Sequence, residues 1–317
     1  MLIKTDYRAL HTASQDGLPL AASDGVVVIG NFDGVHRGHQ ALLAHARQMA
    51  NEMGAPMAVL TFSPHPRFYF KPDEPPFKLT DAVQKHELLK KAGADAIVEL
   101  KFDALLSSLP PEEFVEIVLA DGMRARHVVV GDNFAFGRGR KGNLPGLKKM
   151  AKTRLITVTG FRPIADFGHE RISSENIRRA IRNGQMATAE DGLGHPWQIR
   201  SEVVRGQQRG RTIGFPTANL ALEEYLQPKF GVYTAKIKIE GEQGLHRAVM
   251  NIGIRPSFGG IGANLEAHLL DYTGDLYGKI LRVDFGDFLR PEVKFSDLNA
   301  LKEQIDKDVA RARMMLI

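Results

Sequence analysis

The sequence of 317 residues contains no cysteine, which excludes disulfide bonds, thiolate metal sites, iron–sulfur clusters and cysteine nucleophiles. It also lacks a long apolar run, because no stretch approaches the roughly 18 residues that a membrane-spanning helix requires. The first residues, MLIKTDYRAL, have no apolar signal-peptide core. These absences predict a cytoplasmic protein that does not enter a membrane.

Charge of neither sign dominates the sequence. Lys and Arg exceed Asp and Glu by 42 − 37, which gives a net charge of +5. This mild excess suits phosphate-bearing ligands as well as nucleic acid, so charge alone does not choose between them. The length exceeds the usual size of a single hydrophobic core and favours two domains.

The first part of the chain alternates apolar runs with helical patterns. The runs are apolar throughout rather than alternating, and they cover residues 26–30, 57–62, 96–100, 127–131 and 155–160. Helices are expected over 38–53, 82–91, 111–120 and 147–153, and from an N-cap at Ser173 to Gly184. Strands that are covered on both faces read this way, so we predict a Rossmann-like α/β domain with a parallel, doubly wound sheet.

The pattern changes after the stretch AEDGLGHPW. Apolar and polar residues then alternate in IRSEVV, GVYTAKIKI, LHRAVMNIG, LEAHLLDY and KILRVDF. Such strands, separated by glycine turns, favour a small antiparallel β-barrel. A C-terminal helix is expected within 296–316, with Leu298, Leu301, Ile305 and Val309 at helical spacing. The predicted domains are residues 1–187 and 188–317.

The stretch GNFDGVHRGHQALLAHA, Gly30 to Ala46, follows the first buried run and opens a helix. Ligands of parallel α/β sheets bind beyond the carboxyl ends of the strands. Glycines there allow close approach, and the helix that follows offers free N–H groups to an anion. The two histidines, His36 and His39, have three interpretations: solvated or capping side chains, a metal pair, or groups that stabilise charge on a phosphate. No further ligand stands at the spacing of an H-E-x-x-H zinc site.

Two glycine-rich stretches lie further along the chain. GRGRKG, residues 137–142, satisfies G-x-G-x-x-G but does not stand directly between a strand and a helix, which disfavours a nicotinamide-dependent dehydrogenase. It is a solvated surface loop, a mobile loop near phosphates or, through Arg138, Arg140 and Lys141, a segment that binds RNA. GQQRGRTIGFPTANL, residues 206–220, resembles no Walker A sequence, yet its glycines and arginines can cradle phosphates.

Several motifs together resemble one family. HRGH matches the H-x-G-H pattern of nucleotidylyltransferases, and it stands in order with TFSPHP, VVGDNFAFGRGRKG, RISSENIR, PTAN, NIGIRPSF and LEAHLLDYTGDLYG. This set is similar to the prokaryotic bifunctional riboflavin kinases/FMN adenylyltransferases. The resemblance implies that the C-terminal barrel phosphorylates riboflavin to FMN with ATP and Mg²⁺. It implies that the N-terminal domain adenylylates FMN with ATP to FAD and pyrophosphate.

The resemblance also implies roles for individual residues. In the adenylyltransferase, His36 and His39 are catalytic, and the ATP and its phosphates meet Gly30, Asn31, Phe32, Asp33, Ser173, Ser174 and Arg178. Flavin or FMN meets His65, Asn133 and Arg171. In the kinase, ATP meets Gly206, Gly210, Arg211, Gly214, Thr217 and Asn219, of which Thr217 and Asn219 hold Mg²⁺.

Glu266 is the implied catalytic base of the kinase, because an alcohol acceptor must lose a proton. Its strand pattern places it on the face opposite to Leu265, Ala267 and Leu269, together with His268 and Leu270. A solvated, outward-facing Glu266 and a simple turn at Thr217–Asn219 are the alternatives. The implied partners are riboflavin, FMN and ATP, with no nucleic acid and no membrane. The sequence does not predict an oligomeric state.

Three positions depart from the family pattern. Glu175 stands where the family usually has Thr, Ser201 where it commonly has Gly, and His195 where Arg is common. Two other functions remain open. One is adenylylation of another acceptor such as a pyridine mononucleotide, which would leave PTAN and Glu266 without a role. The other is nucleic-acid binding by the 137–142 loop, which lacks interleaved aromatic residues.

Overall fold

A computed structural model describes the chain except for residues 17–19, 163–165, 168–169, 207–213, 258–259 and 317. The chain forms two compact units. The first contains Met1–Glu74 and Ala82–Glu170, and the second contains Pro75–Asp81 and Arg171–Ile317. The compact units therefore divide between Glu170 and Arg171, and the division of activities expected between residues 187 and 188 stays a prediction.

The first unit contains a six-stranded parallel sheet in the order β1-β4-β3-β2-β5-β8. The strands are β1 (Leu2–Thr5), β2 (Val26–Ile29), β3 (Met57–Ser63), β4 (Ala96–Lys101), β5 (His127–Gly131) and β8 (Thr157–Phe161). The last strand begins two residues later than expected, because Leu155 has a φ of 57° and is 93% exposed.

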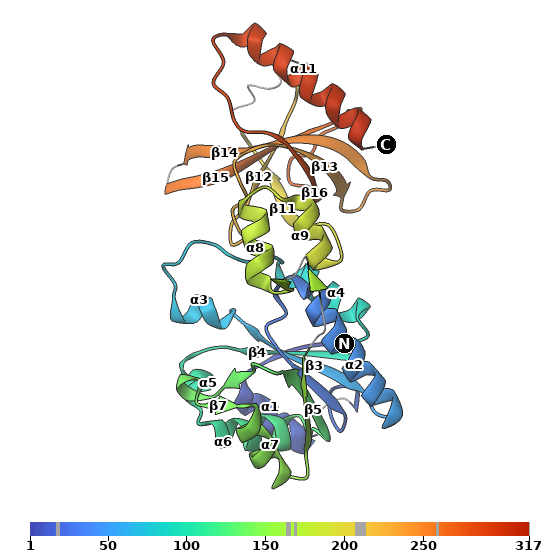
Figure 1. Ribbon diagram of the computed structural model, residues 1–317, viewed down its shortest axis with the longest axis vertical. Helices are drawn as coiled ribbons and strands as arrows, with labels where there is room; N and C mark the ends of the chain where they lie inside the picture. The colour runs from blue at the N-terminus through green and yellow to red at the C-terminus, as the bar shows by residue number, and fades with distance from the viewer. Residues whose placement is uncertain (17–19, 163–165, 168–169, 207–213, 258–259, 317) are drawn as a thin grey trace. The chain divides into compact units, whose positions relative to one another are not determined.

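Both faces of this sheet are covered by helices (Figure 1). Val26 and Val28 of β2 belong to a core with residues of α2 (Arg37–Glu52) and α4 (Ala82–Lys91). Val27 and Ile29 belong to a second core with residues of α1 (Tyr7–Asp16), η3 (Phe114–Gly122) and α7 (Leu144–Lys152). This arrangement explains the uninterrupted apolar runs and confirms the predicted doubly wound sheet.

The remaining elements of the first unit are short, except for one helix of unusual pitch. They are η1 (Leu20–Ala22), η2 (Asp33–Val35), α3 (Pro66–Phe70), α5 (Ala104–Ser108), α6 (Pro111–Glu113), β6 (Ala135–Phe136), η4 (Arg138–Arg140), β7 (Gly142–Asn143) and β9 (Asp166–Phe167). The helix predicted over 111–120 continues from α6 into η3, which is a π-helix. Its last turn closes with Met123 N donating to the Val118 carbonyl.

The second unit is built around a closed antiparallel barrel with the strand order β11-β12-β15-β14-β13-β16. The strands are β11 (Gln198–Val204), β12 (Ala218–Ala221), β13 (Gly231–Ile239), β14 (His246–Ser257), β15 (Gly260–Leu269) and β16 (Ile280–Arg290). Alternate residues fill its interior, and Tyr233, Met250 and Val283 are fully buried. The barrel confirms the alternating pattern seen in the sequence.

Two helices precede the barrel, and a short strand, β10 (Glu170–Arg171), leads into them. They are α8 (Ser174–Arg182), as predicted, and α9 (Met186–Leu193), which occupies the stretch expected to be a domain boundary. The glycines of AEDGLGHPW suggest a break, but only Gly194 ends a helix, with a φ of 77° after Leu193.

Residues 75–81 belong to the second unit although they lie far upstream in the sequence. Phe77 and Leu79 are buried, and the Trp197 indole N–H donates to the Leu79 carbonyl at 3.0 Å. The Leu226 N–H donates to the Lys78 carbonyl at 2.8 Å. This segment thus completes the core and the backbone hydrogen bonding of the second unit.

The C-terminal helix α11 (Leu298–Met315) covers an outer part of the barrel (Figure 1). The predicted apolar stripe is wrong at its start, because Leu298 is 67% exposed. Ala312 and Asp308 are the buried residues of this helix. Asp308 accepts from Arg290 at 2.8 Å, and this ion pair at the end of β16 accompanies the apolar packing of Ala312 and the partly buried Val309.

Candidate active sites

The order of the parallel sheet reverses between β2 and β5. From β2 the chain builds β3 and β4 on one side, and it then crosses to β5 and β8 on the other. In open α/β sheets the crevice at the carboxyl ends of two such strands is the place where ligands bind. Gly30 to His39 follow β2, and Asp132 and Asn133 follow β5, so both segments flank this crevice.

The turn after β2 has a strained backbone. Phe32, Gly34 and Val35 all have positive φ, at 52°, 80° and 38°. A β-branched residue such as Val35 rarely adopts this conformation, and such strain concentrates at functional sites. Burial holds it, since Phe32 and Val35 are 0% and 1% exposed. Phe32 therefore has no exposed side chain to offer the predicted ATP site.

The same turn leaves little room for a side chain at position 30. A Cβ on Gly30 would lie 3.0 Å from the ring of Phe32, which packs under the backbone there. The Gly30 N–H donates to the Leu60 carbonyl of β3. Asn31 is exposed and Asp33 is buried. The predicted set Gly30–Asp33 thus forms one tight, well-packed turn before α2.

His36 and His39 lie together at the start of α2. Their rings stack with centroids 3.6 Å apart, and the edge of Phe32 meets His39 at 5.2 Å. His36 is the N-cap, because its Nδ1 accepts from the His39 N–H at 3.3 Å. An accepting Nδ1 carries no hydrogen, so the ring hydrogen lies on Nε2, which can donate to an anion.

The geometry bears differently on the three interpretations of these histidines. The capping interpretation is confirmed for His36. Within the described residues, no cluster of three His, Cys, Asp or Glu side chains is arranged to hold a metal ion. Stabilisation of phosphate charge by His36 and His39 stays a prediction, for which the helix N-terminus and the Nε2 donor are suitable.

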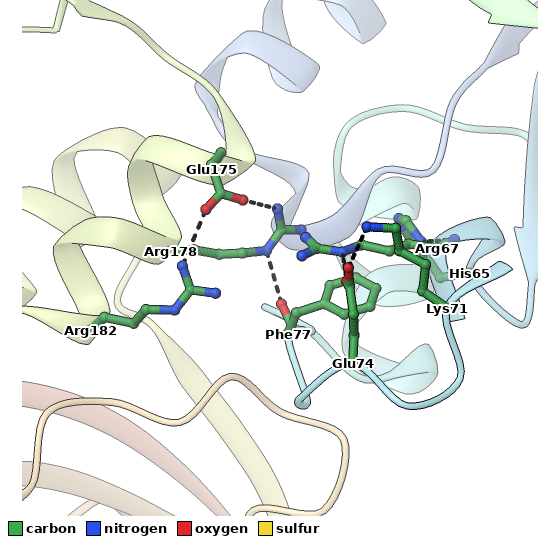
Figure 2. A network of polar contacts seen from close by, with 8 residues as sticks. All are labelled: His65, Arg67, Lys71, Glu74, Phe77, Glu175, Arg178 and Arg182. Carbon is green, nitrogen blue, oxygen red and sulfur yellow. Dashed lines mark hydrogen bonds and ion pairs between the residues drawn. The ribbon is translucent and has the colours of Figure 1, made fainter. Parts of the chain in front are cut away.

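The predicted flavin-binding residues occupy three separate segments. His65 caps α3, and its Nδ1 accepts from the Arg67 N–H at 3.0 Å. Asn133 is exposed in the turn that follows β5. Arg171 lies in β10, where only the backbone is described. Beside His65, Glu74 binds Lys71 and Arg67, both at 2.6 Å (Figure 2), and these hydrogen bonds lower its pKa.

RISSENIR, residues 171–178, belongs to the second compact unit, whereas the turn after β2 belongs to the first. Ser173 caps α8 by accepting from the Asn176 N–H at 3.2 Å, and Ser174 is the first residue of the helix. Arg178 is buried, and its Nε donates to the Phe77 carbonyl at 2.9 Å.

The structure gives a structural role to Glu175, which stands where the family usually has Thr. Its carboxylate accepts from Arg178 at 3.3 Å and from Arg182 at 3.1 Å (Figure 2). It therefore occupies one nitrogen of the arginine that is predicted to bind phosphate. The spacings of three and seven residues on one helix face are the sequence signal that could have found these pairs.

In the barrel, Asn219 and Glu266 are brought directly opposite each other. They are paired residues of β12 and β15, which places their side chains on the same face. Asn264 Nδ2 donates to Glu266 Oε1 at 3.1 Å and to Asn219 Oδ1 at 3.4 Å. Sequence reasoning missed Asn264, although its spacing of two from Glu266 on a strand was the available signal.

The predicted alternation along β15 is confirmed. Leu265, Ala267 and Leu269 are buried, whereas Glu266 and His268 are half-buried on the outer face. His268 Nδ1 lies 2.8 Å from the Pro216 carbonyl, so the ring donates there and holds the segment that leads to Thr217. This contact supports an orienting role for His268.

The glycine-rich segment before β12 approaches Asn219 closely. A Cβ on Gly206 would lie 2.3 to 2.5 Å from the side-chain amide atoms of Asn219. Gly214 has a φ of 89° and is exposed. Gly210 and Arg211 lie outside the described residues. Thr217 is half-buried and directly precedes β12.

The GRGRKG loop has a structural explanation. It contains η4 and connects β6 to β7, so it does not stand between a strand of the parallel sheet and a helix. A Cβ on Gly137 would lie 2.8 Å from Pro111, and one on Gly142 would lie 2.7 Å from the Phe136 ring. Packing therefore accounts for two of its three glycines, as expected for a false dinucleotide fingerprint.

Comparisons with known proteins match both parts of the chain. The family model described as FAD synthetase matches residues 19–176, and that described as riboflavin kinase matches residues 193–316. The chain is similar to three proteins named bifunctional riboflavin kinase/FMN adenylyltransferase. The one from Haemophilus influenzae is 38% identical over 96% of this chain and 97% of its own length. The one from Escherichia coli K12 is 39% identical, with 96% of each chain covered.

A third such relative, from Pseudomonas fluorescens, is 41% identical over 92% of both chains. Among solved structures, one described as a macrolide-efflux protein from Streptococcus pneumoniae has a TM-score of 0.84 and 33% identity. It covers 95% of this chain and 96% of that one. In the part of the chain that the structure describes, no helix combines the length and apolar character needed to cross a membrane.

Proposed function

The chain belongs to the family of bifunctional riboflavin kinases/FMN adenylyltransferases, and we propose that it performs the two reactions with separate sets of residues. It phosphorylates riboflavin to FMN, and it adenylylates FMN to FAD with release of pyrophosphate. The observation that carries this conclusion is the pair of family matches on different parts of one chain, within relatives that cover nearly its whole length.

The kinase reaction needs a proton acceptor. Its acceptor substrate is a primary alcohol, whose proton must leave as the γ-phosphoryl group of ATP arrives. We assign this step to Glu266, and the hydrogen bond from Asn264 holds the carboxylate in place. Asn219, opposite Glu266, and Thr217 then face the phosphates of ATP.

The oxygen donors of this site suit Mg²⁺ bound with ATP. The Thr217 hydroxyl and the Asn219 amide oxygen are hard ligands of the kind that Mg²⁺ prefers. Because the described residues contain no cluster of three carboxylates or histidines, the ion would take most of its ligands from ATP and water. When bound, it offsets the negative charge of the phosphates.

The adenylylation reaction needs no base. The phosphate of FMN is already largely ionised near neutral pH, since its second pKa is about 6. The enzyme must align this phosphate with the α-phosphorus of ATP and offset the charge that spreads in the transition state. We assign this work to His36, His39 and the backbone N–H groups of Gly30–Asp33, with Ser173, Ser174 and Arg178 also binding phosphates and His65, Asn133 and Arg171 binding the flavin.

Riboflavin, FMN and ATP are the proposed partners. The cytoplasmic location, the absence of nucleic-acid and membrane partners, and the assignment of activities to residues 1–187 and 188–317 stay predictions.

Incubation of the purified full chain with riboflavin, ATP and Mg²⁺ tests the proposed function. Chromatography over time should show FMN rising first and FAD following, because FMN is the product of one reaction and the substrate of the other. Supplying FMN directly should give FAD without a lag. Appearance of neither flavin, or of FMN alone in both incubations, would contradict the proposal.

Gly206→Ala should slow riboflavin phosphorylation by about 10–100-fold, because small misplacements of reacting groups carry penalties of this size. The new Cβ would displace the amide of Asn219 from its place opposite Glu266. Initial rates of FMN formation measure the effect. Gly241→Ala is the control for general destabilisation, since no atom lies within 4 Å of a Cβ there but its φ of 84° strains an alanine. An equal loss in both variants would show that general destabilisation is the cause.

A further inference from the structure

A buried ionic cluster lies on one face of the parallel sheet and is not used by the proposed mechanism. Glu99 of β4 is 4% exposed, and its carboxylate contacts His86 Nε2 at 2.9 Å and Lys85 Nζ at 3.6 Å, both from α4. Lys4 of β1 approaches it at 3.7 Å. Burial raises the pKa of Glu99, but the hydrogen bond from His86 and the charges of Lys85, His86 and Lys4 outweigh this effect and lower it to about 2.

Such a cluster is not explained by stability alone. Desolvation of a buried ion pair offsets much of its Coulombic gain, so an apolar replacement is often no less stable. The cluster occupies positions on the same face as Val59 and Ile97, where the sheet core is otherwise apolar. The other contacts of Glu99, Lys85 and His86 therefore indicate what the cluster does.

Lys85 connects the cluster to Thr61 of β3. Thr61 is paired with Glu99 in the sheet register and is completely buried. Lys85 Nζ lies 3.4 Å from Thr61 Oγ1, and the side chain of Lys85 is only 12% exposed. Glu99 thus holds the ammonium group of Lys85 beside the hydroxyl of Thr61.

Thr61 in turn contacts the turn that is proposed to bind ATP. Its hydroxyl donates to the Asn31 carbonyl at 3.3 Å. An ammonium group only donates and a carbonyl only accepts, so the hydroxyl between them must accept from Lys85 and donate to Asn31. Helix α4 also packs against η2, which contains the next residues of this turn.

We propose that Glu99, Lys85 and Thr61 form a positioning relay for FMN adenylylation, which fixes the Asn31 carbonyl and with it the backbone N–H groups of residues 30–33. The proposal rests on the assignment of this turn to ATP phosphates. The turn contains the strained residues Phe32 and Val35, and strained backbone keeps its geometry only where its surroundings restrain it. The relay supplies that restraint at the residue before Phe32.

Thr61→Val keeps the shape of the side chain and removes the relay. We expect kcat for FMN adenylylation to fall about tenfold, because the N–H groups lose their alignment with the transition state. KM for ATP should change much less, since ground-state binding does not depend on that alignment. Thr61→Ser keeps the hydroxyl and should restore kcat. Riboflavin phosphorylation by the same molecules should remain at the wild-type rate.

Two further comparisons separate positioning from folding. Thr159→Val is the matched control, because it makes the same substitution in another strand of the same sheet. It removes the hydroxyl that lies 3.1 Å from His127 Nε2 and should leave adenylylation unchanged. Lys85→Met should reproduce the kcat loss of Thr61→Val, and Lys85→Arg should recover part of it. The Lys85 pair decides the question if Thr61→Val does not fold.

Several results would overturn the relay. These are a wild-type kcat in Thr61→Val or in Lys85→Met, an equal loss of both reactions, a change in KM alone, or a Thr61→Ser variant as slow as Thr61→Val. A wild-type chain that forms no FAD would instead count against the proposed function. The two failures are therefore distinguishable.

Discussion

Glu266→Gln is expected to lower the rate of riboflavin phosphorylation by about 10²–10⁴-fold, the range for loss of a general base. This corresponds to about 3–5 kcal/mol of transition-state stabilisation. The substituted amide has nearly the size of the carboxylate, so the pairing of β12 with β15 should persist. What is lost is the negatively charged carboxylate, the base that accepts the proton of the substrate alcohol. Conversion of added FMN to FAD should continue at the wild-type rate.

The measurement is the initial rate of FMN formation at saturating ATP and riboflavin, with FAD formation from added FMN measured on the same preparation. Glu303→Gln is a matched control, because it makes the same chemical change at an exposed position of α11. A Glu266→Gln variant with near-normal FMN formation would remove Glu266 from the proposed role. Parallel loss of both reactions would point to misfolding.

The helices and strands were predictable because the pattern of apolar residues along the sequence reflects which faces of each element are buried. Runs such as VVVI have no polar face, and in the structure both of their faces pack against helices. The barrel strands alternate, and their apolar residues point inward. These patterns depend only on residues that are near one another along the chain, so the sequence alone is enough to predict them.

The features that were missed depend on contacts between distant segments. No pattern in the sequence assigns residues 75–81 to the second unit, to which hydrogen bonds from the Leu226 N–H and the Trp197 indole N–H tie them. Leu298 fits a helical stripe, yet the buried face of α11 is the one that carries Ala312, which joins the barrel's apolar cluster, and Asp308, which pairs with Arg290. Local periodicity cannot report either choice.

The candidate sites show the same division. Glu266 could be placed on the outer face of its strand from alternation, and Asn219 was singled out by its motif. Their direct pairing, and the bridging hydrogen bonds from Asn264, required the register of β12 against β15. Likewise, His36 and His39 were identified by spacing, but the strained φ of Val35 beneath them has no signal in the sequence.

His39→Ala should have the opposite selectivity to Glu266→Gln. We expect FMN adenylylation to fall by about 10²–10³-fold, a size typical of removing one preorganised group from a developing anion. Riboflavin phosphorylation should be unaffected. The imidazole of His39 stacks on His36 at 3.6 Å, so its removal takes away one ring and the support of the other.

His39 is a better test than His36 for a structural reason. The N-cap of α2 is formed by His36 Nδ1 and the backbone N–H of residue 39, and alanine at position 39 keeps that N–H. Alanine at position 36 would also lose the cap, at a cost of about 0.5–2 kcal/mol in stability. The rate change in His39→Ala can therefore be interpreted as a change in chemistry.

His45→Ala is the matched control for His39→Ala, because it removes an imidazole from the same helix. His45 stacks on Phe161 at 5.1 Å, away from the turn after β2. FAD formation from added FMN should thus be nearly normal in His45→Ala and strongly reduced in His39→Ala. If the two variants lose equal activity, the effect belongs to helix α2 as a whole. If His39→Ala slows both reactions equally, the two activities do not reside in separate sites.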